Sequence, residues 1–347
     1  MKKAYLVLAN GKVFEGEAFG AVGNTVGELV FTTSVVGYLE TMTDPNHYGQ
    51  IVVQTFPMLG NYGVIEEDLL GKPYINGYIV REYCEIPSNF RSQYEIEKYM
   101  VDNSIIGICG VDTRELTKII REEGSMNAVI CTSLPADKAL LESYEIKDAV
   151  KSVASADSAV YAAEDEKYKV TLVNFGSVGN LIKEFNARGC TVKTVAYTAS
   201  AEEICEGADA VILSDGPGNP EEVAACVEEI KKIDLPVFAC GLGHCLLAMA
   251  NGGKIAKLKY GHHGSNQPVK YLNSVRSYIT AQNHGYIVEA DTVNGAKLSF
   301  KNINDATCAG LEYDNAVSVA FNAATCAGPQ NTGFVFDSFI TKMGGKN

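Results

Sequence analysis

Two different patterns of apolar and polar residues follow one another along the chain of 347 residues. From Ala4 to about Ile130, short apolar runs are separated by Gly, Asn and Pro turns, which is typical of β-strands. The strongest signal is a hairpin in which an Asn-Gly turn joins Tyr5–Leu8 to Lys12–Phe14. From Tyr168 onward, apolar strands alternate with amphipathic helices. We therefore expect an α/β protein with a β-rich N-terminal domain and a C-terminal domain on a mainly parallel, doubly covered sheet.

Local signals place individual helices within these two parts. Asp112 and Glu115 form a capping box at the start of a helix that should end at Gly124. Hairpins are expected after Lys254, and a closing helix near residues 334–342. We therefore expect a helix among the strands of the N-terminal part and a helix at the end of the chain.

The segment that connects the two patterns has its own composition. Residues 152–166 are small, polar and acidic, which suits a connection between domains. We expect domains at 1–150 and 168–347, joined by a linker at 151–167.

Composition and charge narrow the classes of partner. A net charge of −13 and a pI near 4.9 argue against nucleic acid or an anionic membrane surface. No apolar run reaches the roughly eighteen residues that a membrane span needs. The ten cysteines show no paired spacing, which indicates a reducing cytoplasm and mostly buried thiols. Neither a metal site nor a cofactor is expected.

One stretch has the form of a catalytic turn. Residues 235–240 read as a short buried strand and 244–250 as a helix, with Gly-Leu-Gly between them. In such a strand–turn–helix elbow, the side chain at the apex is exposed and the following backbone N–H groups face an oxyanion. The Gly-Pro-Gly turn at 216–218 follows another predicted strand, so both turns should lie at the carboxyl edge of one sheet.

The elbow resembles the Gly-x-Cys-x-Gly-His-Gln motif of class I glutamine amidotransferases. Aligned through Leu242-Gly243-His244, the family's nucleophilic cysteine falls on Gly241 and its glutamine on Cys245. The resemblance therefore implies the frame of the site without its nucleophile.

Further segments are similar to the small subunit of glutamine-dependent carbamoyl phosphate synthetase. They are the Gly-His-His-Gly-Ser-Asn run at 261–266, the Gln-Asn-His-Gly run at 282–285 and, in the N-terminal half, the runs at 31–38, 43–45, 49–52, 88–91 and 110–114. From chemistry alone, each of these histidines is more often a structural residue than a base. The resemblance covers nearly the whole chain.

This resemblance implies an ancestral role: hydrolysis of glutamine to supply ammonia for carbamoyl phosphate, in pyrimidine and arginine biosynthesis. It implies a protein partner, the large subunit that carries the ligase chemistry, and hence a heterodimer. The residues that it assigns to a glutamine pocket are Ser34, Gly216, Gly218, Leu242, Cys245, Asn283, Gly285 and Tyr286.

The same alignment removes the catalytic groups. Glutamine hydrolysis needs a thiolate, a histidine that moves its proton and a carboxylate that orients the histidine. With Ser318 and Gly328-Pro329 as fixed points, the family's histidine becomes Asn322 and its glutamate becomes Ala324. With Gly241, three roles are missing, and we expect a structural or regulatory subunit without glutaminase activity of its own.

Two other interpretations remain open. The chain could bind glutamine or another amide as a sensor, because the predicted pocket residues persist. It could also be a rewired thiol hydrolase that uses Cys240 or Cys245, with His262 or His284 as a base. Whether the chain is an enzyme is thus not decided by its sequence.

Overall fold

The computed structural model describes residues 2–136, 138–325 and 328–344. Its contacts divide the chain into two units. The first unit holds Met1–Lys147 and Lys259–Gly264, and the second holds Asp148–Leu258 and Ser265–Asn347. Helix α5 (Ala149–Val153) and strand β10 (Ala159–Tyr161) lie in or beside the segment expected to be a linker and belong to the second unit. The borders expected at 150 and 168 stay a prediction.

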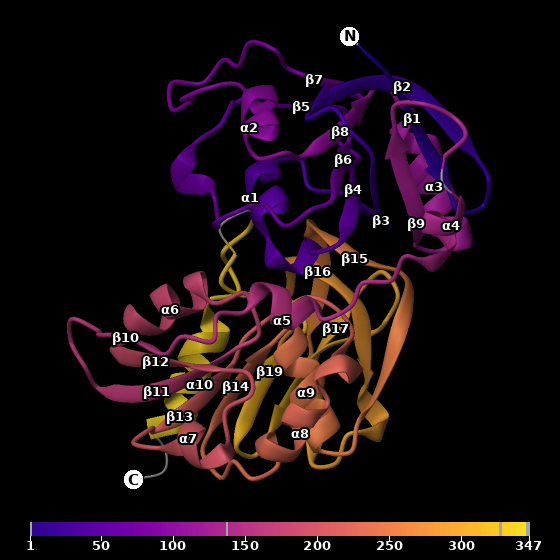
Figure 1. The fold of residues 1–347 in the computed structure, drawn as a ribbon. Helices are drawn as coiled ribbons and strands as arrows, with labels where there is room; N and C mark the ends of the chain where they lie inside the picture. The colour runs from indigo at the N-terminus through magenta and orange to yellow at the C-terminus, as the bar shows by residue number, and fades with distance from the viewer. Residues whose placement is uncertain (1, 137, 326–327, 345–347) are drawn as a thin grey trace. The chain divides into compact units, whose positions relative to one another are not determined.

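The first unit is built on a closed barrel with the strand order β1-β2-β8-β6-β4-β3-β9 (Figure 1). The hairpin expected at its start is confirmed, with Gly11 at φ +88° in the turn. The strands are β1 (Lys3–Leu8), β2 (Val13–Gly20), β3 (Thr25–Thr32), β4 (Gln50–Gln54), β6 (Gly77–Ile79), β8 (Ile106–Cys109) and β9 (Met126–Cys131), with a separate pair β5 (Met58–Leu59) and β7 (Glu82–Tyr83).

Helices cover this barrel with apolar stripes. They are α1 (Tyr38–Thr43), α2 (Ile96–Asp102), α3 (Thr113–Glu123) and α4 (Lys138–Ser143). The capping of α3 is confirmed at Asp112, whose carboxylate accepts hydrogen bonds from the N–H groups of Arg114 and Glu115, both at 3.0 Å. The helix ends at Gly124, as expected, and it buries Leu116 among its apolar residues.

The second unit contains a ten-stranded sheet in the order β10-β12-β11-β13-β14-β19-β18-β17-β15-β16. Its strands are β11 (Tyr168–Asn174), β12 (Cys190–Ala196), β13 (Ala210–Leu213), β14 (Val237–Cys240), β15 (Lys254–Tyr271), β16 (Ser277–Glu289), β17 (Ala296–Asn302), β18 (Cys308–Tyr313) and β19 (Ala316–Val319). The run β12-β11-β13-β14-β19 is parallel, whereas β10, β18 and β17 pair antiparallel with their neighbours. The expected parallel core is therefore confirmed, and an antiparallel extension continues it.

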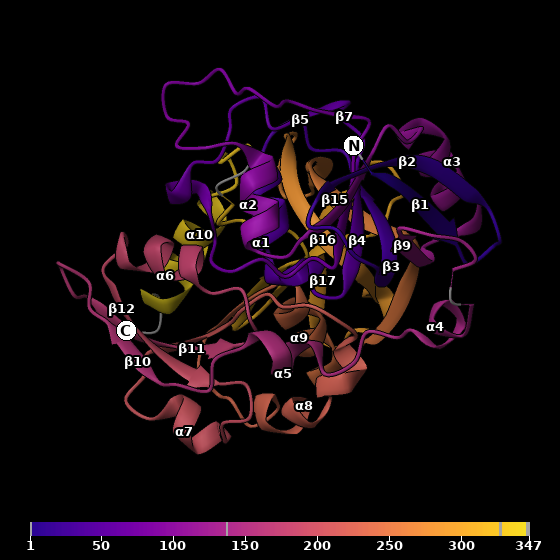
Figure 2. The same ribbon diagram turned by 45° about the horizontal axis from the view of Figure 1, so that its top comes forward.

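Helices cover both faces of the parallel core. Leu172, Ile212 and Phe238 pack with α6 (Gly179–Asn186) and α10 (Phe334–Gly344). Their neighbours Val173 and Leu213 point to the other face, which is covered by α7 (Ala201–Cys205), α8 (Ala225–Ile230) and α9 (Leu242–Ala250). Figure 2 shows α6 and α10 on one side of β11 and α7 and α8 on the other. The period of two along each buried strand produces this two-sided core.

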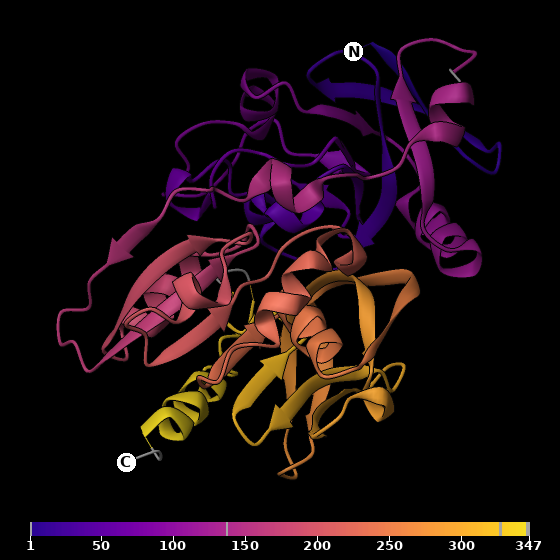
Figure 3. The same cartoon turned by 60° about the horizontal axis from the view of Figure 1, so that its bottom comes forward.

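The last helix closes the second unit. Figure 3 shows α10 in yellow beside the marked C-terminus. Its side chains Val335, Phe336 and Phe339 are buried, and the expected closing helix is thus confirmed. No helix among the described residues is both long and apolar enough to cross a membrane.

Candidate active site

The strand–turn–helix elbow is present at the carboxyl end of β14. Gly241 stands between β14 and α9 with φ +52° and ψ −115°, a backbone conformation that residues with a side chain rarely adopt. Its N–H donates to the carbonyl of Val319 at 3.0 Å, and its own carbonyl accepts from Cys245 N–H at 3.3 Å. The helix begins two residues earlier than its apolar pattern indicated, directly after the apex. The backbone of a nucleophile elbow is therefore formed, but its apex carries no side chain.

A carboxylate occupies the space beside the apex. Asp215 follows β13, and its Oδ1 atom accepts the N–H of Gly216 at 2.8 Å and the N–H of Leu242 at 2.9 Å. The residue is 7% exposed. A Cβ atom added to Gly241 would overlap Oδ1 and Cγ of Asp215. The Asp215 side chain thus stands where the side chain of a nucleophile at position 241 would begin.

The loop at 216–218 is packed tightly against its neighbours. A Cβ atom on Gly216 would overlap the carbonyl of Phe175, and one on Gly218, at φ +88°, would lie 2.8 Å from the Cβ of Ala149 in α5. The Ser214 hydroxyl accepts the N–H of Phe175 at 2.9 Å and holds the start of the loop. These contacts require glycine at both positions and fix the Gly216 N–H in place.

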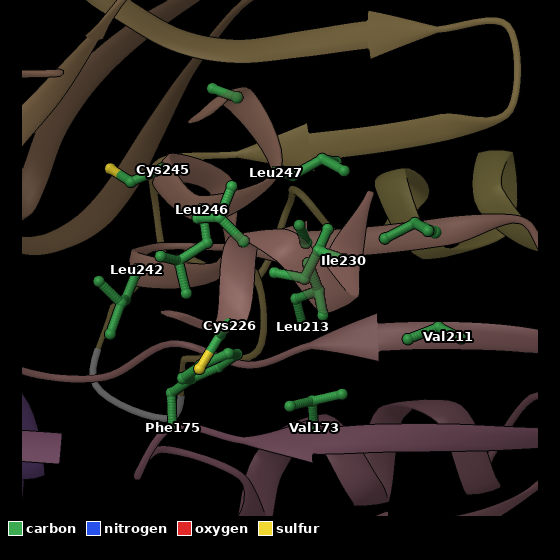
Figure 4. Close-up of a cluster of buried hydrophobic side chains, with 14 of the residues drawn as sticks. Val173, Phe175, Val211, Leu213, Cys226, Ile230, Leu242, Cys245, Leu246 and Leu247 are labelled. Atoms are coloured by element: carbon green, nitrogen blue, oxygen red, sulfur yellow. The ribbon is translucent and has the colours of Figure 1, made fainter. Parts of the chain in front are cut away.

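Helix α9 packs its first turns into the apolar core. Leu242 and Leu246 lie in the same cluster as Leu213 and Ile230 (Figure 4). Cys245, which the motif alignment assigns to the family's glutamine, belongs to this cluster and is 5% exposed. Burial, and then the charge of the nearby Asp215, raises the pKa of the Cys245 thiol far above its ordinary value.

The other cysteine of the elbow points into the opposite core. Cys240 is 3% exposed, and its Sγ atom donates weakly to the carbonyl of Leu213 at 3.9 Å. Burial, followed by the charge of Asp215, raises the pKa of this thiol well above its ordinary value. Neither thiol has the electropositive, accessible setting of a reactive cysteine.

The residues that the motif alignment assigns to the family's histidine and glutamate lie after β19. Asn322 forms a β-bridge with Ala281, to whose carbonyl its N–H donates at 2.9 Å. Its side-chain Oδ1 accepts the N–H of Ala324 at 3.0 Å, which closes a local turn. Ala324 is 6% exposed and offers no polar side chain. The segment is ordered by backbone contacts and holds no base.

The predicted pocket residues Asn283, Gly285 and Tyr286 follow one another on β16, in the same unit as the elbow. Their neighbour His284 has both ring nitrogens engaged, with Nδ1 2.9 Å from the carbonyl of Tyr286 and Nε2 3.2 Å from Oε1 of Gln282. These contacts fit a structural role for His284, which is commoner for a histidine than a role as a catalytic base. The assignment of Asn283, Gly285 and Tyr286 to a glutamine pocket stays a prediction.

Two of the predicted features belong to the first unit. Ser34 is buried there. Its N–H donates to Oγ1 of Thr32 at 3.3 Å, and its carbonyl accepts from Nε2 of Gln54 at 2.7 Å. His262 and His263 also cluster with this unit, and the ring of His263 stacks on that of His47 with centroids 5.8 Å apart.

Two contacts at the elbow are not identified by the sequence motifs. Ser318, a fixed point of the motif alignment, is hydrogen-bonded to His244 of α9, and nothing in its local sequence marks this contact. The sequence marks Asp215 only as part of a turn, although its place at the carboxyl end of a parallel strand is a usable signal. Within the described residues, no group of three or more His, Cys, Asp and Glu side chains could hold a metal ion.

The second unit has the fold class of the class I glutamine amidotransferases, and the family model described as glutamine amidotransferase class-I matches residues 171–341. The model described as carbamoyl-phosphate synthase small chain, CPSase domain, matches residues 6–130. The chain is 44% identical to the carbamoyl phosphate synthase small chain of Clostridium perfringens, over 97% of this chain and 99% of that one. It is 38% identical to the carbamoyl phosphate synthase pyrimidine-specific small chain of Bacillus subtilis, over 97% and 95%. The chain therefore belongs to the carbamoyl phosphate synthase small chain family, and the resemblance drawn from its motifs is confirmed.

Among solved structures, a putative GMP synthase subunit of Thermoplasma acidophilum is similar, with a TM-score of 0.46 and 16% identity, over 51% of this chain and 94% of that one.

Proposed function

We propose that this chain is a carbamoyl phosphate synthase small subunit without glutaminase activity, which acts as a structural or regulatory partner of a large subunit. The ancestral role is hydrolysis of glutamine to supply ammonia for carbamoyl phosphate. The observation that carries the proposal is the elbow at Gly241, whose backbone is formed around a position that has no nucleophile.

The residues that the alignment assigns to the histidine and glutamate positions cannot replace the missing groups. The amide of Asn322 cannot accept a proton near neutral pH, and its oxygen is already bonded to the N–H of Ala324. Ala324 cannot orient a base. Loss of the nucleophile or the base of a triad typically lowers turnover about a million-fold, or about 8 kcal/mol of barrier. One such loss would suffice, and here three coincide.

The rewired thiol hydrolase receives no support from the surroundings of the two candidate thiols. Cys240 and Cys245 are both buried, and burial together with the Asp215 carboxylate disfavours the thiolate at each. One of the proposed bases, His284, is engaged by Tyr286 and Gln282. These contacts favour the inactive subunit.

A role beside a large subunit accords with family membership over the whole chain. We propose that the two subunits form a heterodimer in the cytoplasm. The nine described cysteines are free thiols, which suits a reducing compartment. The small subunit would stabilise its partner or control its use of ammonia.

The test measures glutamate release from glutamine by the purified chain, alone and with a carbamoyl phosphate synthase large subunit. The control is a relative that carries cysteine, histidine and glutamate at the three positions. We expect glutamate release only from the control, and ammonia-dependent synthesis of carbamoyl phosphate by both complexes. Glutamate release by this chain at the rate of the control would overturn the proposal, and so would failure to bind a large subunit.

A further inference from the structure

The two N–H groups that bond to Oδ1 of Asp215 come from two different segments of the chain. One belongs to Leu242, the residue after the apex, and the other to Gly216 in the neighbouring loop. In enzymes with a strand–turn–helix elbow, the N–H of the residue after the nucleophile and an N–H from a neighbouring loop form the oxyanion hole. The pair in this chain is therefore arranged to bind one negatively charged oxygen, and Oδ1 of Asp215 is that oxygen.

We propose that the carboxylate of Asp215 is an internal oxyanion that occupies this hole and closes the site to substrates. The inference rests on the proposed loss of glutaminase activity and explains what holds the inactive site together. The carboxylate makes two charge-assisted hydrogen bonds at the N-terminus of α9, where the helix dipole favours negative charge. Without it, the buried N–H of Leu242 and the partly buried N–H of Gly216 would lose their protein partner.

Gly241 and Asp215 depend on each other. A side chain at position 241 would overlap Oδ1 and Cγ of Asp215, so the carboxylate can reach the hole only because the apex is glycine. Conversely, a cysteine placed at this position would meet the carboxylate before it met a substrate. Restoring the nucleophile alone would not restore a working site.

The same arrangement bears on the sensor hypothesis. The carbonyl oxygen of a bound amide would need the N–H groups of Gly216 and Leu242, which already bond to Asp215. An amide ligand would have to displace a buried carboxylate that the protein itself supplies. We therefore expect glutamine binding to be weak in the parent chain and stronger once Asp215 is shortened.

The first test is rescue of an Asp215→Ala variant by acetate, a small anion that carries the carboxylate deleted by the substitution. We expect acetate to raise the Tm of this variant more than equal concentrations of chloride do, and to leave the parent unchanged. The matched control is Asp209→Ala, because Asp209 stands at the other end of β13 and its Oδ2 accepts one exposed N–H, from Lys169, at 2.8 Å. Asp215→Asn keeps an acceptor oxygen and should show no rescue. Equal responses of D215A and D209A to acetate would overturn the proposal.

The second test measures the reactivity of a thiol and so does not rely on the Tm of D215A. The thiol introduced by a Gly241→Cys substitution should react slowly with iodoacetamide, as read by peptide mass spectrometry. In D215A/G241C the oxyanion hole and helix N-terminus are open to the thiolate. Labelling of this double variant should be faster by at least about tenfold, the change that one unit of thiol pKa produces. Equal labelling in the two variants would contradict the proposal.

Neither test measures glutaminase activity, so the two proposals can fail separately. Glutamate release by the parent would remove the proposed function. Absence of acetate rescue, beside an inactive parent, would remove only the internal oxyanion.

Discussion

The imidazole of His244 and the hydroxyl of Ser318 are hydrogen-bonded, with Nδ1 and Oγ 2.8 Å apart, and they fasten the first turn of α9 to β19. Both residues are buried, and Nε2 of His244 has no hydrogen-bond partner among the described residues. Burial lowers the pKa of His244 to about 4. The bond is therefore made by a neutral ring at physiological pH, and it holds the elbow by a contact that acid should weaken.

The first prediction concerns this acid sensitivity. Because the pKa of His244 is depressed in the folded state, unfolding takes up a proton below the unfolded pKa of about 6.5. The stability that the neutral ring contributes is present above that pH and is lost as the pH falls toward 4, by about 3 kcal/mol at most. We expect His244→Asn to lower stability at pH 7.5 and to show a smaller loss between pH 7.5 and 4.5 than the parent, measured by urea unfolding. An unchanged pH dependence would contradict this account.

The variant His47→Asn provides a comparison in the other unit. Burial also lowers the pKa of His47 to about 4, although Nδ1 of this ring is 2.8 Å from Oε1 of Gln50. The same reasoning applies to it, so the two variants should each remove a separate part of the acid loss.

The second prediction concerns the close approach of α9 to β13. A Cβ atom on Gly243 would lie 2.5 Å from the carbonyl oxygen of Leu213, and that backbone cannot move aside. We expect Gly243→Ala to destabilise the chain by about 2–3 kcal/mol through overpacking. Gly179→Ala is the matched control, because Gly179 begins α6 and a methyl group added there would have nothing within 4 Å. The control should be neutral or stabilising by up to about 1 kcal/mol in chemical unfolding. A neutral G243A would show that helix and strand are looser than described.

The third prediction concerns a buried carboxyl in the first unit. Burial raises the pKa of Glu40 in α1 to about 7, and the charge of Asp68 adds to this shift. Its Oε2 atom is buried without a hydrogen-bond partner among the described residues. For an acid whose folded pKa is raised, the contribution to stability is present below the unfolded value of 4.5 and is lost as the pH rises through about 7.

Replacing the carboxyl by an amide should therefore help at high pH. We expect Glu40→Gln to raise stability at pH 8.5 by about 2 kcal/mol and to change it little at pH 4.5, measured as Tm or urea midpoint. Glu142→Gln, at an exposed position of α4, is the control and should change neither value. A gain of equal size at both pH values would argue against ionisation as the cause.

Much of the fold was predictable because its signals are local. The Asn-Gly turn fixes the first hairpin, and Asp112 fixes the start of α3 by bonds to residues two and three positions away. The alternation of strands and helices after Tyr168 likewise predicts the doubly covered parallel core. In each case the sequence neighbours carry the interaction.

Closure of the barrel was not predictable, because it depends on pairings between distant strands. Strand β1 pairs with both β2 and β9, which are separated by about a hundred residues, and no local pattern distinguishes a closed barrel from an open sheet. The antiparallel extension of the second sheet depends in the same way on β17 and β18.

The backbone frame of the elbow was predictable from the sequence, but what fills the site was not. The assignment of Gly241, Asn322 and Ala324 to the triad positions rests on the motif alignment and stays a prediction. The position of the Asp215 carboxylate follows from the empty apex 26 residues further along the chain, since the distance in sequence from 215 to 241 hides their contact. An absent side chain leaves space, and only the three-dimensional packing shows which neighbour takes it.

The last prediction concerns the two cysteines of the elbow. Cys240 and Cys245 are buried, and burial and the Asp215 charge keep both thiols protonated at neutral pH. In the native chain at pH 7.5 we expect iodoacetamide to label the partly exposed Cys84 and Cys205 first, and to reach Cys240 and Cys245 only when the chain unfolds. The variants Cys240→Ser and Cys245→Ser should leave any residual glutamate release unchanged. Rapid labelling of either thiol in the folded chain, together with loss of glutamate release in the matching serine variant, would instead identify a thiol hydrolase that uses a displaced nucleophile.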